Sequence, residues 1–242
     1  MANISIVIPT YNERDNVVLL VQQIVKLLPN SRILVIDDNS PDGTAEVLRN
    51  LKIPNLTVFV RNERGLGSAL RYGIKKALEL ETEFIVTMDA DLSHDPSYLR
   101  QMTKIAIEGK YDLVIGSRYV RGGGIENWSL RRRVISRGAN YLFRLISHSP
   151  VNDNTSNYRV YSRKAGTLAL NCETTNGYEF QICSVFKIIK SNLRTVEYPI
   201  IFKDRKAGKS KLRISEILNW FLYSIKLSLS SLLAQKEESC NF

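Results

Sequence analysis

Histidine and cysteine are scarce in this chain, which has two histidines and three cysteines among its 242 residues. No Ser/His/Asp or Cys/His arrangement includes His94 or His148, so catalysis through a covalent intermediate is not expected. Cys172, Cys183 and Cys240 have neither metal-ligand nor disulfide spacing. We therefore expect no disulfide and a reducing compartment, the cytosol by default.

The sequence also lacks the marks of several protein classes. Its start, MANISIVIPTYNE, has no basic segment and no cleavage site, so no secretory signal peptide is expected. No internal repeat or linker divides the 242 residues, a length that suits one domain with at most an appendage. No recognisable nucleic-acid module is present, so nucleic acid is not an expected partner. Hydrophobic residues make up 44% of the chain, as in a folded globular protein.

Acidic residues are few where basic residues gather. The net charge of +10 predicts an anionic partner, such as a phosphorylated substrate or an anionic membrane. Seven arginines and one acidic residue, Glu126, lie between residues 118 and 144. A second basic cluster follows at 203–213, where Asp204 is the only acid. Because the first half mixes both signs, we expect it to bind a metal and the second half to bind anions.

Apolar runs alternate with helical patterns through the first half of the chain. The runs expected to form strands lie at residues 4–8, 33–36, 56–60, 84–88 and 113–115. Strands that alternate with helices predict a mostly parallel α/β sheet with helices on its faces. After Arg118 the alternation stops. From there we expect a turn at 122–124, a helix at 131–146, strands at 158–161 and 195–202, a helix at 178–190 and a final helix at 214–233.

Two carboxylates, Asp89 and Asp91, directly follow the apolar run Phe84–Met88. A bend after this strand would turn both toward one cation, and such oxygen ligands suit Mg²⁺ or Mn²⁺ together with substrate phosphates. The alternative is a solvated acidic turn. The polar ends of two earlier runs, at 9–13 and 37–39, would meet the acidic pair at one edge of a parallel sheet.

Eight short motifs follow one another along the chain, over residues 4–213: IPTYNE, VIDDNSPDGT, RGLGSALRYG, MDADLSH, VIGSRY, NYRVYSR, GYEFQ and KSKL. In this order they resemble inverting GT-A glycosyltransferases, and more narrowly dolichyl-phosphate (polyprenyl-phosphate) mannosyltransferases. The resemblance implies a single Rossmann-like GT-A domain at 1–213, with a mixed, mostly parallel sheet, and a C-terminal amphipathic helix and tail at 214–242. It also implies metal-dependent transfer of mannose from GDP-mannose to a polyprenyl (dolichyl) phosphate, with inversion, as in protein glycosylation.

The resemblance assigns donor-binding roles to residues at the strand ends. Asp89 and Asp91, as the DXD motif, would hold Mg²⁺ or Mn²⁺ on the donor diphosphate. The base and ribose would contact Pro9, Tyr11, Glu13 and Asp38. Arg205 and Lys211 would belong to a segment that closes over the phosphates.

The arginines fit an acceptor that is already charged. A phosphate monoester is anionic near neutral pH, so transfer to it needs no general base, unlike transfer to a hydroxyl group. Arginine also offers a planar fork of donors that matches phosphate oxygens. The resemblance places Arg118, Arg132 and Ser136 at the acceptor phosphate, and it groups Arg118 with Asp89 and Asp91 as catalytic.

The chain departs from the family pattern at three points. Ser93 stands where the pattern has a glutamine that could add a metal ligand. Asn157 replaces the glycine of Thr-Ser-Gly-Phe-Arg, a change expected to be mild because asparagine tolerates a left-handed backbone. Cys183 replaces the glutamate that ends Gly-Tyr-x-Phe-Gln-x-Glu. Separately, the Gly65-x-Gly67 loop has two interpretations, a donor contact through helix N–H groups or tight packing.

The C-terminal stretch decides how the chain would meet a membrane. Residues 214–233 have the length of a bilayer span, about 20 residues, but they include Glu216, Asn219 and Lys226, which favour an amphipathic interfacial helix. A helix packed on the protein itself is the alternative. We expect a peripheral enzyme at the cytoplasmic face of a membrane, with a small membrane subunit left open as a partner.

Two other functions compete with mannose transfer. The first is transfer from a UDP-sugar, which would give polyprenyl-phosphate glucose or a related product. The second is a catalytically lapsed basic binding domain, which would keep its ligand affinity without a metal.

Overall fold

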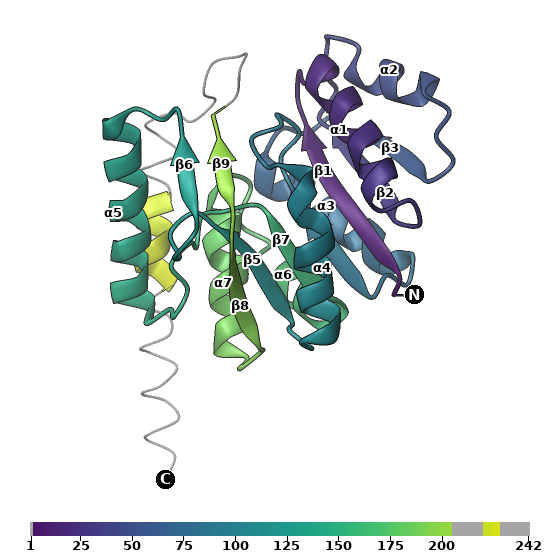
Figure 1. The fold of residues 1–242 in the computed structure, drawn as a ribbon. Helices are drawn as coiled ribbons and strands as arrows, with labels where there is room; N and C mark the ends of the chain where they lie inside the picture. The colour runs from purple at the N-terminus through teal and green to yellow at the C-terminus, as the bar shows by residue number, and fades with distance from the viewer. Residues whose placement is uncertain (1, 205–219, 228–242) are drawn as a thin grey trace.

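The computed structural model describes residues 2–204 and 220–227 (Figure 1). The predictions for Arg205 and Lys211 lie outside these residues, as do both ends of the helix expected at 214–233. Residues 220–227 of that stretch are helical.

Seven strands form the central sheet, and the prediction of a mostly parallel sheet is confirmed. Their order is β3 (Leu56–Val60), β2 (Arg32–Asp37), β1 (Ile4–Thr10), β4 (Phe84–Thr87), β7 (Arg159–Ser162), β5 (Leu113–Ser117) and β8 (Thr195–Pro199). β7 is antiparallel to β4 and β5, whereas the other neighbouring pairs are parallel. The start of β7 therefore lies at the carboxyl ends of β4 and β5, so residues just before β7 reach the same sheet edge as Asp89.

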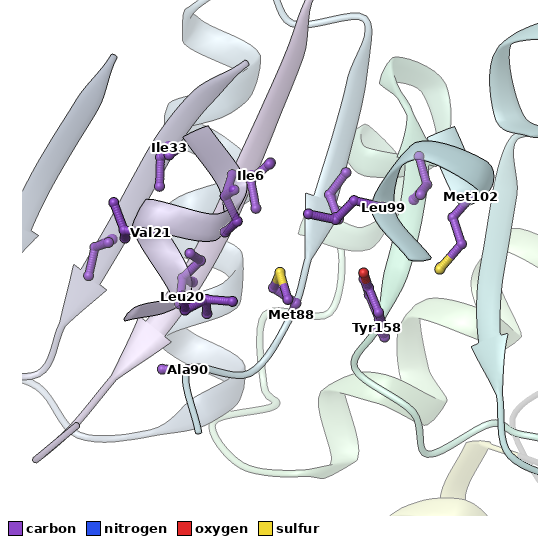
Figure 2. Close-up of a cluster of buried hydrophobic side chains, with 14 of the residues drawn as sticks. Ile6, Leu20, Val21, Ile33, Met88, Ala90, Leu99, Met102 and Tyr158 are labelled. Carbon is purple, nitrogen blue, oxygen red and sulfur yellow. The ribbon is translucent and has the colours of Figure 1, made fainter. Parts of the chain in front are cut away.

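Helices cover both faces of the sheet, because side chains along each strand point alternately to the two sides. One face holds α1 (Arg14–Leu27), α2 (Thr44–Asn50), the short 3-10 helix η1 (Pro96–Tyr98) and α4 (Leu99–Glu108). The other holds α3 (Leu66–Glu79), α6 (Arg163–Leu170) and α7 (Glu179–Lys190). Figure 2 shows the core on the first of these faces. Ile6 and Leu20 lie on one side of Met88, and Met102 lies on the other side of Met88.

The second half of the chain adds a smaller layer beside the sheet. β6 (Gly124–Glu126) and β9 (Ile201–Lys203) pair in parallel next to α5 (Leu130–Ser147) (Figure 1). The expected turn at 122–124 thus leads into a strand, and the strand expected at 195–202 is split into β8 and β9. Pro199, the last residue of β8, has no N–H to donate. Helix α6 has no counterpart in the sequence prediction.

The described part of the C-terminal helix packs on the protein. Trp220 and Leu227 are buried against Phe143 of α5 and Phe186 of α7. Phe221 and Leu222 on the same helix are exposed. Residues 220–227 therefore use one face for internal packing and leave an apolar face outside.

The cysteine prediction was wrong, because Cys172 and Cys183 form a disulfide. Cys172 follows the end of α6, and Cys183 lies in the first part of the neighbouring helix α7. The packing of the two helices brings their Cα atoms to 6.0 Å, within the normal disulfide range, although a separation of 11 residues carries no sequence signature. The expectation of a reducing compartment was based on the absence of a disulfide, so it loses its support.

Candidate active site

A cavity of about 390 Å³ lies between the end of β4 and helix α5. Five residues predicted to act together line it: Asp89, Asp91, Arg118, Arg132 and Ser136. The two acids follow β4, Arg118 follows β5, and the other two residues lie on α5. The structure therefore brings the predicted acidic and basic residues into one site.

The backbone turns sharply after β4, as predicted. Leu92 has a left-handed φ of 61°, and the N–H of Ser93 donates to Asp91 Oδ1 at 3.0 Å. Asp89 Oδ1 accepts a hydrogen bond of 2.9 Å from Asn157 Nδ2. The turn thus presents both carboxylates to the cavity from a backbone fixed by local hydrogen bonds.

The acidic pair fits Mg²⁺ or Mn²⁺, ions that often take one or two carboxylates and complete their shell with phosphates and water. Within residues 2–204 and 220–227, no group of three or more His, Cys, Asp or Glu side chains could hold a metal alone. The side chain of Asp89 is 33% exposed, so a ligand can reach it. The buried hydroxyl of Ser93, near Asp91, has no hydrogen-bond partner in the described structure. The donor set suits an ion that is shared with substrate phosphates.

His94 supports this turn from the protein interior. Its ring lies 5.0 Å from the ring of Tyr158 and 5.3 Å from that of Phe202. Burial lowers the pKa of His94, against the opposing effect of the Asp89 charge, so the imidazole is neutral at pH 7. Its Nδ1 accepts a hydrogen bond of 3.1 Å from the N–H of Asp89. The neutral ring thereby fixes the backbone of Asp89.

Arg118 is held in a buried ion pair with Asp153, a residue that the sequence prediction missed. Arg118 Nε and Nη2 donate to Asp153 Oδ2 and Oδ1, each at 2.7 Å, and Nη2 also donates to Thr155 Oγ1 at 2.8 Å. Burial alone would lower the pKa of Arg118, but the Asp153 carboxylate more than offsets burial and raises that pKa. Burial alone would raise the pKa of Asp153, but the Arg118 charge lowers it. Arg118 is therefore a charged donor in a fixed position.

Arg132 and Ser136 reach the cavity from α5, beside the indole of Trp128. The Arg132 guanidinium lies 3.9 Å from the Trp128 ring centroid and forms an ion pair of 2.9 Å with Asp204. Ser136 Oγ accepts a hydrogen bond of 2.7 Å from the Tyr119 hydroxyl. Trp128 is absent from the sequence prediction, where its only signal is an aromatic residue just before a basic helix. The α5 side of the cavity is thus rich in hydrogen-bond donors.

The residues expected at the base and ribose lie outside the lining of this cavity, at the ends of β1 and β2: Pro9, Tyr11, Glu13 and Asp38. The Arg64 guanidinium lies 4.3 Å from the Tyr11 ring centroid. Asp38 pairs with Arg61 at 2.5 Å and accepts the N–H of Gly65 at 3.0 Å. Leu66, next to Gly65, lines the cavity, so the two regions adjoin.

The two acids at the end of β2 lie in different surroundings. Burial raises the pKa of Asp38, although the hydrogen bond from Arg61 opposes this shift. Asp37 is fully buried and accepts hydrogen bonds from Thr10 Oγ1 at 2.8 Å and Ser40 Oγ at 2.6 Å. Asp37 therefore holds the local structure together and does not face a ligand. Arg61 and Arg64 were missed, because isolated arginines in a mixed-charge segment carry no pattern.

The Gly65-x-Gly67 loop packs tightly against the loop that the disulfide closes. The N–H of Gly67 donates to the carbonyl of Asn176 at 2.9 Å, and a Cβ on Gly67 would lie 2.6 Å from the carbonyl of Thr175. Of the two interpretations of this loop, tight packing accounts for what is observed at Gly67.

Two departures from the family pattern take on a physical meaning. Asn157 does not have a left-handed φ, so the expected backbone explanation is wrong, and its side chain instead contacts Asp89. Cys183 is fully buried in the disulfide and does not line the cavity.

Comparison with known proteins places the chain. The model of the family described as "Glycosyl transferase family 2" matches residues 5–166. The chain belongs to glycosyl transferase family 2. It is a glycosyltransferase, and the order and direction of its strands agree with the GT-A fold implied by the sequence resemblance.

Two relatives in the family carry informative names. The chain is 38% identical over 217 residues to the polyprenol monophosphomannose synthase of Mycolicibacterium smegmatis. The alignment covers 88% of this chain and 82% of the relative. It is 37% identical over 212 residues to the undecaprenyl-phosphate mannosyltransferase of Micrococcus luteus, covering 85% of this chain and 86% of that protein. These relatives confirm the resemblance to polyprenyl-phosphate mannosyltransferases.

Solved structures agree on the fold. Glucosyl-3-phosphoglycerate synthase from Mycobacterium tuberculosis, crystallised with Mn²⁺, UDP and glucosyl-3-phosphoglycerate, matches with a TM-score of 0.70 at 18% identity, over 95% of this chain and 79% of that one. Mannosyl-3-phosphoglycerate synthase from Rubrobacter xylanophilus matches with a TM-score of 0.68 at 17% identity, over 97% and 75%. At this identity the two structures support the fold alone.

Proposed function

We propose that this glycosyltransferase transfers mannose from GDP-mannose to the phosphate of a polyprenyl phosphate, with inversion at the anomeric carbon. The observation that carries the proposal is that Asp89, Asp91, Arg118 and Arg132 all line one cavity. A carboxylate pair suits a metal-bound diphosphate, and guanidinium groups suit a second phosphate. The names of the two relatives support the same donor sugar and the same class of acceptor.

The arrangement suggests a direct displacement. Asp89 and Asp91 would hold Mg²⁺ or Mn²⁺, which when bound neutralises the departing diphosphate. Arg118, fixed by Asp153, and Ser136, fixed by Tyr119, offer donors of defined position to the acceptor phosphate. The acceptor is already an anion, so the chain needs no general base. The Nδ1 atom of His94 accepts the backbone N–H of Asp89, which is consistent with a mechanism that requires no base there.

Arg132 is suited to exchange partners during the reaction. Its ion pair with Asp204 is partly exposed, at 30% and 29% for the two side chains. Exposed ion pairs contribute little to stability, so an acceptor phosphate can replace Asp204 at low cost. Pro9, Tyr11, Glu13 and Asp38 remain our proposal for the base and ribose site, with Arg205 and Lys211 for the closing segment.

Helix α5 has the features of a helix that binds a membrane surface. It has five arginines and no acidic residue, and Leu130, Val134, Tyr141 and Leu145 form an exposed apolar stripe along it. A basic helix with an apolar face suits the interface of an anionic bilayer. No helix in the described part of the chain combines the length and hydrophobicity of a bilayer span. We propose peripheral association through this stripe.

A vesicle assay tests the membrane proposal. Replacing Leu130 and Leu145 together by serine should weaken sedimentation with anionic vesicles by about tenfold, because two exposed apolar side chains leave the interface. Leu19→Ser on α1, at a side chain that is 51% exposed, is the matched control and should change little. Equal binding of all three proteins would contradict the role of the stripe.

The transfer assay tests the function itself. The purified chain is incubated with Mn²⁺ or Mg²⁺, a short polyprenyl phosphate and labelled GDP-mannose, UDP-glucose or UDP-N-acetylglucosamine, and the label in the organic phase is counted. We expect counts from GDP-mannose that vanish with EDTA and in Asp91→Ala. Counts from a UDP-sugar would keep the mechanism and change the sugar. Ligand binding by Asp91→Ala without turnover by the wild type would favour a lapsed binding domain. Activity of the chain alone would also show that no membrane subunit is required.

A further inference from the structure

Two buried amide oxygens in the cavity have no hydrogen-bond partner among the described residues. They are Asn157 Oδ1 and Gln181 Oε1, on side chains that are 5% and 2% exposed. Both residues line the cavity that contains Asp89 and Asp91. A buried acceptor without a partner is rare in folded proteins, because it has lost its hydrogen bonds to water. These two oxygens are therefore placed to meet a ligand.

The direction of the Asn157 amide is fixed by its neighbour. Asn157 Nδ2 donates to Asp89 Oδ1 at 2.9 Å, and an ionised carboxylate can only accept, so the NH₂ group must face Asp89 and the oxygen must point elsewhere. The Thr87 hydroxyl donates to the backbone carbonyl of Asn157 at 2.7 Å, which ties the residue to the end of β4. Asn157 thus offers an acceptor directly beside the proposed metal site.

Gln181 offers its acceptor from a different element, helix α7. Its backbone carbonyl accepts a hydrogen bond of 2.9 Å from the buried Arg159 Nη1. Cys183, two residues further on, is joined to Cys172 by the disulfide. The part of α7 that bears Gln181 is therefore held in place on both sides.

The polarity of these groups selects the kind of ligand that they suit. Arg118, after β5, and Arg132, on α5, present guanidinium donors to the cavity. The buried Trp128 Nε1, just before α5, is a further donor and has no partner among the described residues. Donors suit phosphate oxygens, whereas two amide oxygens would repel them. Acceptors suit hydroxyl groups, and the hydroxyl-rich part of the proposed substrates is the sugar.

We propose that Asn157 and Gln181 accept hydrogen bonds from hydroxyl groups of the donor sugar and thereby help to determine which sugar is transferred. This inference rests on the proposed function. It gives the departure at Asn157 a role, because the glycine of the resembling family would leave that acceptor out. The sugar would lie between Asp89 and α7, and the acceptor phosphate would lie toward α5.

Binding measurements can separate sugar contacts from metal or nucleotide contacts. In the presence of Mn²⁺, calorimetry gives the affinities of GDP-mannose and of GDP for the wild type, Asn157→Gly, Asn157→Ala and Gln181→Leu. Each variant should bind GDP-mannose about threefold to tenfold more weakly, the effect of one lost hydrogen bond, and should bind GDP as the wild type does. Trp128→Phe, in the same cavity, should leave the ratio of the two affinities unchanged. If the donor proves to be UDP-glucose, the same ratio is measured against UDP.

Three results would overturn the inference. The first is an equal loss of GDP and GDP-mannose affinity, which would mean that the amides act only on Asp89 and the metal. The second is an unchanged ratio in both Asn157→Ala and Gln181→Leu while thermal unfolding shows folded proteins. The third result concerns donors that lack one hydroxyl group of the sugar. A variant that has lost the partner of that hydroxyl should weaken the binding of such a donor less than it weakens the binding of GDP-mannose, so an equal loss for both donors would contradict the inference. If the wild type transfers sugar but the ratio of GDP-mannose to GDP affinity is the same in the variants, this inference alone is rejected. If the wild type transfers no sugar, the proposed function is rejected.

Discussion

Arg118 and Arg132 reach the same cavity, but they are held in different ways. Arg118 follows β5, a strand with neighbours on both sides, and its partner Asp153 is fully buried, with both carboxylate oxygens engaged. Arg132 lies near the start of α5, where its pair with Asp204 is partly exposed. The first pair fixes one wall of the cavity before any substrate arrives, and the second can open. A site for two anionic substrates benefits from both properties. The fixed pair keeps Arg118 aligned for the reaction, and the pair that can open frees Arg132 for a substrate that enters.

The largest expected effect comes from breaking the buried pair. Asp153→Ala would leave the Arg118 charge buried without its partner, and such a change costs about 3–5 kcal/mol of unfolding free energy. Urea unfolding measures the loss. Asp153→Asn keeps the shape of the side chain and should lose less stability, while still raising the KM for polyprenyl phosphate because Arg118 is no longer oriented. A change below about 1 kcal/mol in Asp153→Ala would show that the pair does not organise this wall.

The disulfide adds a second fixed element to this comparison, since it ties down helix α7, which bears the cavity residue Gln181. Replacing Cys172 and Cys183 together by alanine should lower the free energy of unfolding by about 2–3 kcal/mol, because the cross-link limits the unfolded chain. Urea unfolding with and without reductant provides the measurement. The double variant also serves as the control, because without the cross-link its midpoint should not change when reductant is added. If the urea midpoint of the wild type is the same with and without reductant, even after full unfolding and refolding, the result would argue against the disulfide.

The smallest effect is expected at the exposed pair. Asp204→Asn should change the free energy of unfolding by less than about 1 kcal/mol, because partly exposed ion pairs contribute little. It should lower the KM for polyprenyl phosphate, since Arg132 no longer has to release a carboxylate. Steady-state kinetics at saturating donor checks this. An increase in that KM would show that Asp204 helps to hold the acceptor.

The sequence predicted most of the strand-borne part of the molecule. Apolar runs such as Phe84–Met88, which only Thr87 interrupts, indicate buried strands, and polar residues after them indicate the functional edge of the sheet. β6 was missed because a strand of three residues carries no periodicity, and β9, equally short, was predicted only as the end of one longer strand. α6 was missed because its alanine and glycine residues pack closely without a strong apolar pattern.

The site shows the same limit at the level of single residues. Asp89 and Asp91 stand out because two acids end an apolar run, whereas Asp153 is one acid in a polar loop and becomes visible only through Arg118. Asn157 was interpreted as a backbone substitution, although its side chain contacts Asp89 from just before β7, the strand that is antiparallel to β4. Such contacts depend on topology, which brings residues 89 and 157 together.

The central claim is that one cavity aligns a metal-bound sugar donor with a lipid phosphate, and the KM for polyprenyl phosphate in Arg132→Gln tests it most directly. At saturating GDP-mannose and Mn²⁺, we expect this KM to rise by about tenfold or more, the effect of a lost charge-assisted hydrogen bond, with an unchanged KM for the donor. Arg133→Gln, at the neighbouring position outside the cavity lining, serves as the control. A KM for polyprenyl phosphate that stays at the wild-type value in Arg132→Gln would contradict the account.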